Sequence, residues 1–438
     1  MALRLTVHRN LFVLAALSLF MTLGACQRFA QDTLPSPTLG PTQETPTTSP
    51  ATPTPTSTTN AVADRIAYVG YNFDIYTITP EGTDERRLTL QDGLYTWPIF
   101  SPNGDSVALS SFSADPPGSS KALYSVDISD NELTRLFKDA PGAGPAIGPR
   151  IPHYGAWSPN SNYLAFLAMG EQGLSLYIVP GSGEEEERLV TSGSPLYLTW
   201  SGDSQSLLIH NGEDLLRMDM DAPGRLLNLE AASSMYRSPA WSPVSDSIAF
   251  LESQGSVETL YVARADGSKR KPVTRVQGTA SFLWAPDGNR LAVGQSLDTE
   301  DPFLQDVRVI DVETAEQRLL VERPVMSFFW SPDGSKIAYV TLSDDAAALQ
   351  WRVVDSLTGE DSKVVDFQPS PDQLTLLAFF DQYALSHQVW SPDSRHLVFS
   401  GTLTGDADEA SQIFVVGVEA GALPRALARG FLATWSHQ

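Results

Sequence analysis

One short pattern recurs along this chain: Trp-Ser-Pro-Asp-Gly, or a close variant, followed within a few residues by an apolar run such as Ile-Ala-Tyr or Leu-Ala-Phe. The tryptophans that mark it are Trp97, Trp157, Trp200, Trp241, Trp284, Trp330, Trp390 and Trp435. Each interval holds four short strand patterns, and a repeat of roughly 40 to 60 residues built in this way is typical of β-propellers. The pattern runs through residues 64–438, so we expect one large domain there.

The unit around Trp284 shows how the repeat is expected to fold. Residues 282–284 are the first strand, and the turn Ala-Pro-Asp-Gly-Asn follows, in which proline fixes φ while aspartate and glycine favour turn conformations. Residues 290–293, 307–310 and 317–320 are then the remaining strands. We predict that each tryptophan packs between neighbouring sheets, burying on the order of 200 Å². The acidic turn residue is expected to shape the turn and not to act in catalysis.

Counting the second strands of the units gives the expected number of blades. There are eight, near Ala67, Ala108, Ala165, Leu208, Ala249, Ala292, Ala338 and Val398. The first unit lacks an inner strand, which residues 431–436 can supply, while its outer strands lie within residues 66–89. We therefore predict an all-β protein, a β-propeller of eight four-stranded blades in which the C-terminal strand closes the first blade and protects the sheet edges. Seven blades is the alternative.

Two units carry a resemblance to a known family. Trp330-Ser-Pro-Asp-Gly-Ser-Lys-Ile-Ala-Tyr339 and Trp390-Ser-Pro-Asp-Ser-Arg-His-Leu-Val-Phe399 resemble the WD-repeat-like propeller units of the TolB family. Similar units occur in the propellers of prolyl-oligopeptidase-type peptidases. The resemblance implies a propeller fold, although TolB has a small amino-terminal α/β domain and six blades. The chain contains no Gly-x-Ser-x-Gly nucleophile pattern, and we expect no enzyme activity.

The first residues resemble an export signal. Arg4, His8 and Arg9 precede an apolar run over residues 11–23, and Leu-Gly-Ala-Cys ends at Cys26, the chain's single cysteine. This ending resembles a bacterial lipobox, which implies cleavage after residue 25 and lipidation of Cys26. The alternative is an ordinary signal peptide, residues 1–25, followed by a chance cysteine. With lipidation, the protein would be anchored to the outer side of a bacterial cell membrane or outer membrane.

The next segment, together with Cys26, covers residues 26–63 and is rich in threonine, proline and serine. Such a segment buries too little apolar surface to offset its ordering entropy, so we expect a tether between the lipid anchor and the propeller of residues 64–438. The chain holds 29 Lys and Arg against 52 Asp and Glu, a formal net charge of −23. This charge makes nucleic acid a poor partner and favours solubility.

The candidate binding residues follow from where the repeat is interrupted. All long insertions fall in the loops between the second and third strands or between units, which share one face of a propeller, and loops of this length are often functional. In the insertion at residues 369–387, Ser-Pro-Asp-Gln predicts the start of a short helix. The candidate pocket residues, which could instead only cap loops by hydrogen bonds, are Arg150, His153, Tyr154, Arg237, Asp381, Tyr383 and His387. A weak calcium candidate comprises Asp406, Asp408 and Glu409.

Three functions remain open at this point. The first is a membrane-anchored extracytoplasmic module that binds or scaffolds a protein, a peptide or another cell-envelope component through its loop-rich face. The second is a propeller hydrolase with an active site at the central channel, and the third is a purely structural component of an envelope complex. We expect no cofactor, because no metal-binding, phosphate-binding or dinucleotide-binding pattern is present in the sequence. We also expect a monomeric protein.

Overall fold

Short antiparallel strands form almost all of the regular structure in this computed structural model. The structure describes residues 64–90, 93–114, 117–138, 154–170, 173–232, 238–254, 257–297, 303–405 and 410–437. All of them belong to the unit Asp64–Gln438. The predicted signal peptide, the lipidated Cys26 and the tether lie outside the described residues.

Five sheets hold four strands each. Their strands are β4 (Leu94–Phe100), β5 (Ser106–Ala114), β6 (Pro117–Asp127) and β7 (Leu133–Lys138); β8 (Tyr154–Trp157), β9 (Tyr163–Gly170), β10 (Gly173–Pro180) and β11 (Arg188–Ser192); β12 (Leu196–Trp200), β13 (Ser206–Asn211), β14 (Asp214–Asp219) and β15 (Leu226–Ala232); β16 (Ala240–Trp241), β17 (Ser247–Gln254), β18 (Val257–Arg264) and β19 (Lys271–Val276); and β20 (Thr279–Trp284), β21 (Arg290–Ser296), β22 (Asp306–Asp311) and β23 (Gln317–Val321).

A sixth sheet has ten strands. They are, in spatial order, β24 (Ser327–Trp330), β25 (Lys336–Leu342), β26 (Leu349–Asp355), β27 (Asp361–Pro369), β28 (His396–Leu403), β29 (Gln412–Gly417), β30 (Arg425–Trp435), β1 (Ile66–Gly70), β2 (Ile75–Ile78) and β3 (Arg86–Arg87). Two short helices, α2 (Pro371–Ala378) and α3 (Phe380–Tyr383), lie between β27 and β28 in the chain.

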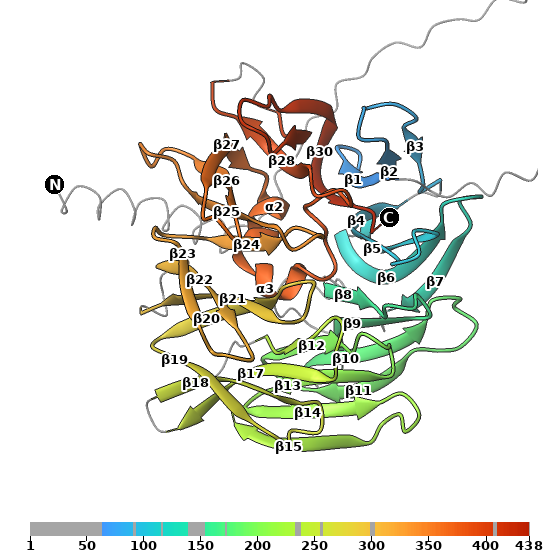
Figure 1. The fold of residues 1–438 in the computed structure, drawn as a ribbon. Helices are drawn as coiled ribbons and strands as arrows, with labels where there is room; N and C mark the ends of the chain where they lie inside the picture. Colours follow the sequence, from blue (N-terminus) through green and yellow to red (C-terminus); the bar gives the residue numbers. More distant parts are fainter. Residues whose placement is uncertain are drawn as a thin grey trace, which may run out of the picture. The chain divides into compact units, whose positions relative to one another are not determined.

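The sheets follow one another around a centre in which α2 and α3 lie (Figure 1). The protein is therefore a multi-blade β-propeller, as the repeat predicted. The first strands of the units are buried, as in β8 and β12, because both of their faces pack against neighbouring sheets. The predicted count of eight blades stays a prediction, since one hydrogen-bonded sheet runs through β24–β27, β28–β30 and β1–β3.

The two ends of the propeller chain pair as predicted. The first half of β30 pairs with β29, and its second half pairs with β1 from Ile66 opposite Trp435 to Gly70 opposite Gly430. The backbone N–H of Arg65 donates to the Ser436 hydroxyl at 3.0 Å, and the N–H of Ser436 donates to the Arg65 carbonyl at 2.8 Å. The predicted closure by the C-terminal strand is confirmed.

The repeated tryptophans pack between sheets and also hydrogen-bond across them. Five of the indole N–H groups donate to a backbone carbonyl in the first strand of the preceding unit: Trp157 to Ile99 (3.2 Å), Trp200 to Ala156 (2.9 Å), Trp284 to Ala240 (3.3 Å), Trp330 to Leu283 (3.2 Å) and Trp390 to Phe329 (3.1 Å). Trp97 differs. Phe100 takes the place directly before the turn serine, and Trp97 lies in a bulge with φ 52°.

The turn after each tryptophan has a structural role, as its composition predicted. The Ser331 hydroxyl accepts the N–H of Lys336 at 2.9 Å and donates to the Asp333 carboxylate at 2.6 Å. Although partial burial acts in the opposite direction, hydrogen bonds from Ser331 and Ser335 hold the pKa of Asp333 below its usual value. The N–H of Asp333 also donates to the Ser394 hydroxyl of the next unit at 3.1 Å. These hydrogen bonds therefore hold the conformation of the turn and connect it to the turn of the next unit.

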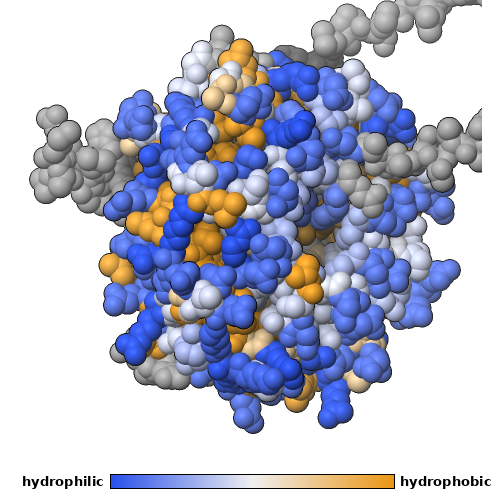
Figure 2. Space-filling view, viewed as in Figure 1, coloured by the Kyte–Doolittle hydropathy of each residue, from blue (hydrophilic) through white to orange (hydrophobic). Residues whose placement is uncertain are grey.

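The face seen in Figure 2 is mostly hydrophilic, and hydrophobic side chains interrupt it in patches. Within the described residues, no helix combines the length and the hydrophobicity needed to cross a membrane.

Candidate functional site

The insertion between β27 and β28 forms two helices that lie in the central channel. Ser370 caps α2 by accepting the backbone N–H of Gln373 at 3.1 Å, and proline occupies the first helical position, as the sequence predicted. The Gln373 side chain does not complete a capping box. Its amide oxygen accepts the N–H of Ser400 in β28 at 3.0 Å, which ties the helix to the ring.

One side of the inserted segment contacts β20 and β24. The ring of Phe380 lies 4.7 Å from that of Phe328 and 5.9 Å from that of Phe329, centroid to centroid. Asp381 accepts a hydrogen bond of 3.1 Å from the Ser281 hydroxyl of β20. These contacts anchor α3 to the inner strands by apolar packing and by a side-chain hydrogen bond.

The other side of the segment contacts β4 and β8. The Tyr383 ring stacks on Trp97 with a centroid distance of 5.0 Å and meets Tyr154 edge-on at 5.5 Å. The His387 ring is edge-on to both Trp97 and Tyr383, at 5.5 and 5.4 Å. The segment 370–387, which we call the plug, therefore bridges inner strands from separate parts of the ring and fills the channel between them.

Burial changes the acidity of the plug's polar groups. Desolvation lowers the pKa of His387 to about 3, because burial of the whole ring disfavours its protonated form. Its Nδ1 lies 2.9 Å from the Ser386 hydroxyl, and its Nε2 has no hydrogen-bond partner among the described residues. Burial also raises the pKa values of the Tyr154 and Tyr383 hydroxyls. At neutral pH these three side chains are uncharged.

Four of the predicted pocket residues come together in this region. Tyr154, Asp381, Tyr383 and His387 all belong to the plug or contact it, and Tyr154, Tyr383 and His387 are buried. Arg150, His153 and Arg237 lie outside the described residues, as do the calcium candidates Asp406, Asp408 and Glu409. The described part of the chain contains no cluster of His, Cys, Asp and Glu suited to a metal ion. The binding role of the seven residues stays a prediction.

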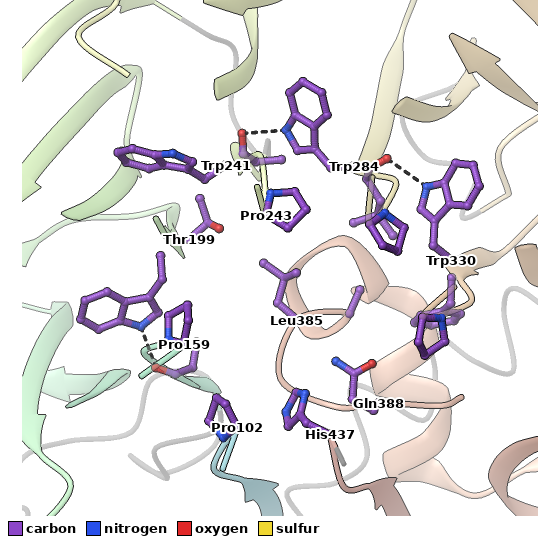
Figure 3. Close-up of a pocket in the computed structure, with 18 of the residues that line it drawn as sticks. Pro102, Pro159, Thr199, Trp241, Pro243, Trp284, Trp330, Leu385, Gln388 and His437 are labelled. Atoms are coloured by element: carbon purple, nitrogen blue, oxygen red, sulfur yellow. Dashed lines mark hydrogen bonds between the residues drawn. The ribbon is translucent and has the colours of Figure 1, made fainter. Parts of the chain in front are cut away.

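A cavity of about 480 Å³ lies at the end of the channel where the first and second strands of the units meet. We call this cavity the channel mouth. Its wall repeats around the ring, with turn prolines and the edges of the packing tryptophans, and includes Pro102, Pro159, Pro243, Pro286, Pro332, Pro392, Trp157, Trp200, Trp241, Trp284, Trp330 and Trp390. Figure 3 shows several of these side chains, among them Pro159, Trp241 and Pro243, arranged around Leu385, which belongs to the plug.

Leu385 is the main apolar group that the plug presents to the channel mouth. It is 52% exposed, although the rings of Phe380 and Tyr383, a few residues earlier, are buried. The polar residues of the wall are Thr199, Asp381, Gln388, Ser436 and His437, of which Asp381 is one of the predicted pocket residues. Burial lowers the pKa of His437 to about 4, so its ring is neutral at pH 7. The channel mouth therefore suits an apolar group that also forms a small number of hydrogen bonds.

Sequence reasoning missed this cavity because it assigned function to the interruptions of the repeat. The channel mouth lies on the face of the tight turns, opposite to the loop-rich face. The signal was present in the repeat itself: six units place one proline in a turn at the end of an inner strand, and these turns surround a common centre.

Comparison with known proteins finds likeness in structure only. No protein-family model and no curated protein sequence matches the chain. Its fold is similar to that of the dihydro-heme d1 dehydrogenase NirN, with 12% identity over 85% of this chain and 75% of that chain and a TM-score of 0.55. It is also similar to an oligogalacturonate lyase from Vibrio parahaemolyticus, with 15% identity, coverage of 82% and 97%, and a TM-score of 0.50.

TolB proteins are also among the similar structures. A putative TolB from Agrobacterium tumefaciens shares 21% identity over 62% of this chain and 95% of that chain, with a TM-score of 0.38. Similarity at these levels of identity shows the propeller fold alone.

Proposed function

We propose that this chain is an exported, membrane-anchored β-propeller that binds an extended peptide segment of a cell-envelope protein at the channel mouth. The observation that carries the proposal is the cavity with Leu385 on its floor and turn prolines around it. An apolar side chain exposed within a concave apolar wall is the arrangement expected of a binding pocket.

The plug closes the inner end of the cavity. Phe380 and Tyr383 fill the channel behind Leu385, so a ligand would enter from the turn face and rest against the plug. A volume of about 480 Å³ accommodates a few side chains of a peptide. Gln388 and His437 line the cavity and would supply hydrogen-bond donors to the free backbone carbonyls of an extended segment.

Export and anchoring are part of the proposal and rest on the sequence. The apolar run over residues 11–23 followed by Leu-Gly-Ala-Cys26 supports cleavage and lipidation, and residues 27–63 would link the anchor to the propeller. The likeness to a lyase and a dehydrogenase is one of fold and does not favour a hydrolase active site at the central channel.

A peptide array tests the binding site with a matched pair of variants. Leu385→Asp places a charge on the cavity floor, whereas Leu357→Asp places one on an outer turn of the same face, where Leu357 is 73% exposed. We expect apolar peptides to bind the wild type and Leu357→Asp equally, and to bind Leu385→Asp at least about tenfold more weakly. Peptide binding that Leu385→Asp leaves unchanged, or no binding by any of the three proteins, would refute the proposal.

A further inference from the structure

One carboxylate lies in the wall of the channel mouth. Asp381 belongs to α3, and its Oδ2 accepts the Ser281 hydroxyl of β20 at 3.1 Å. The described residues that line the cavity include no other Asp and no Glu, Lys or Arg. Burial lowers the pKa of His437 to about 4, so this ring adds no positive charge at pH 7. The described wall therefore carries negative charge and no positive charge.

Asp381 and Leu385 lie about one helical turn apart on the plug. The backbone N–H of Ala384 donates to the Phe380 carbonyl at 2.7 Å, and Ala384 has helical φ and ψ of −57° and −25°. Residues four positions apart on a helical backbone are neighbours on one side of it. Both side chains line the cavity. The inner end of the channel mouth thus combines an apolar side chain with a carboxylate.

This combination matches the side chain of a lysine or an arginine. Each has an aliphatic stem that packs on apolar surface and a cationic head that bonds to carboxylates. The stem would contact Leu385 and the tryptophan and proline side chains of the wall, and the head would reach Asp381. A carboxylate has about four lone-pair sites, so it can accept the Ser281 hydroxyl and a ligand cation together.

We infer that the channel mouth binds a lysine or arginine side chain of its peptide ligand, with the cationic head bonded to Asp381. This inference rests on the proposed function, because it specifies the chemistry of the peptide bound at the same cavity. An acidic side chain at that position would bring like charges together in a poorly hydrated cavity and would be rejected. The formal net charge of −23 would also speed the approach of a basic segment.

Nine-residue peptides with a variable central residue test the inference. The flanking positions are mixtures of alanine, valine, leucine and proline, and the central residue is lysine, norleucine or glutamate. We expect the wild type to bind the lysine pool about tenfold more tightly than the norleucine pool, and to bind the glutamate pool most weakly. The quantity compared between proteins is the ratio of the norleucine and lysine dissociation constants, in which a general loosening of the plug cancels.

A matched pair of variants assigns this preference to one carboxylate. Asp381→Asn removes the charge but keeps an oxygen that can accept the Ser281 hydroxyl, and we expect the ratio to fall to about one. Asp393→Asn is the control, since this side chain is 51% exposed in a turn of the same face and does not line the cavity. Asparagine already occupies the corresponding turn position at Asn103 and Asn160, so the control should fold and keep the tenfold ratio.

The outcomes separate this inference from the proposed function. Loss of the lysine preference in Asp381→Asn alone supports the inference. Equal binding of the lysine and norleucine pools by the wild type overturns it, as does a preference that Asp381→Asn retains or that Asp393→Asn also loses. In those cases peptide binding that Leu385→Asp still weakens preserves the proposed function. No binding of any pool by the wild type overturns both.

Discussion

The buried ring of His387 predicts how the stability of the propeller depends on pH. In the unfolded chain a histidine has a pKa of about 6.5, whereas burial in the plug lowers that of His387 to about 3. Between these values the unfolded state binds a proton that the folded state does not bind. The free energy of unfolding should therefore fall by about 1.4 kcal/mol per pH unit as the pH decreases below 6.5, and by about 2 kcal/mol at pH 5.

The variant His387→Phe isolates this contribution. Phenylalanine keeps an aromatic ring between Trp97 and Tyr383 but cannot be protonated. We expect guanidinium unfolding at pH 7, 6 and 5 to show a slope shallower than that of the wild type by about 1.4 kcal/mol per pH unit below pH 6.5. His437, whose pKa is also lowered by burial, is present in both proteins, so its contribution cancels. His396→Gln, at the half-exposed start of β28, is the control.

Parallel slopes for the wild type and His387→Phe would refute the reasoning. Such a result would mean that His387 becomes protonated in the folded protein, and therefore that water or a partner reaches its Nε2. A lower stability of His387→Phe at every pH, together with the shallower slope, would show a packing defect in addition to the loss of the titrating group. The comparison depends on the slope, so it holds even if the substitution costs stability.

Three further predictions follow from the fold and the sequence. Deleting residues 431–438 removes the buried Leu432 and Trp435 and the pairing with β1, so we expect a large drop in melting temperature, whereas removal of Gln438 alone should change it little; equal melting temperatures would contradict circular closure. Trp200→Phe removes the indole bond to the Ala156 carbonyl and should lower the free energy of unfolding by about 1–2 kcal/mol in a denaturant titration; a change within error would assign the tryptophan to packing alone. Cys26→Ser should move the protein from the membrane fraction to the soluble fraction after cell lysis; continued membrane association would exclude the lipid anchor.

The repeat could predict the fold because its signals are local. Proline, aspartate and glycine together favour a turn that reverses the direction of the chain. One tryptophan per unit indicates which strand packs between neighbouring sheets. The same reasoning predicted the cap of α2 at Ser370, since a capping side chain bonds to a backbone group three residues away. The pairing of Ile66 with Trp435 was also accessible, because the first unit lacks one strand and the last residues supply it.

The location of the plug could not be predicted, because it depends on contacts between distant residues. The pattern of residues 369–387 indicates a helix but not that Tyr383 stacks on Trp97, which is nearly three hundred positions earlier in the chain. Trp97 itself was misread for a related reason. It matches the repeat by residue type, yet Phe100 holds the packing position, and the bulge at Trp97 becomes understandable only once the plug is in the channel.

The plug also unites two features that the sequence presents separately. The interruption of the repeat supplies the floor of the channel mouth through Leu385, and the uninterrupted units supply its wall through their turn prolines. Neither forms a pocket alone: a ring without the plug is an open channel, and the plug without the ring is a short helical loop. The specificity of the site should therefore respond to changes at Leu385 and at residues that position it, such as Phe380 and Asp381, more than to changes in any single turn. A wall made of similar units can tolerate the loss of one proline, whereas the floor has a single central side chain.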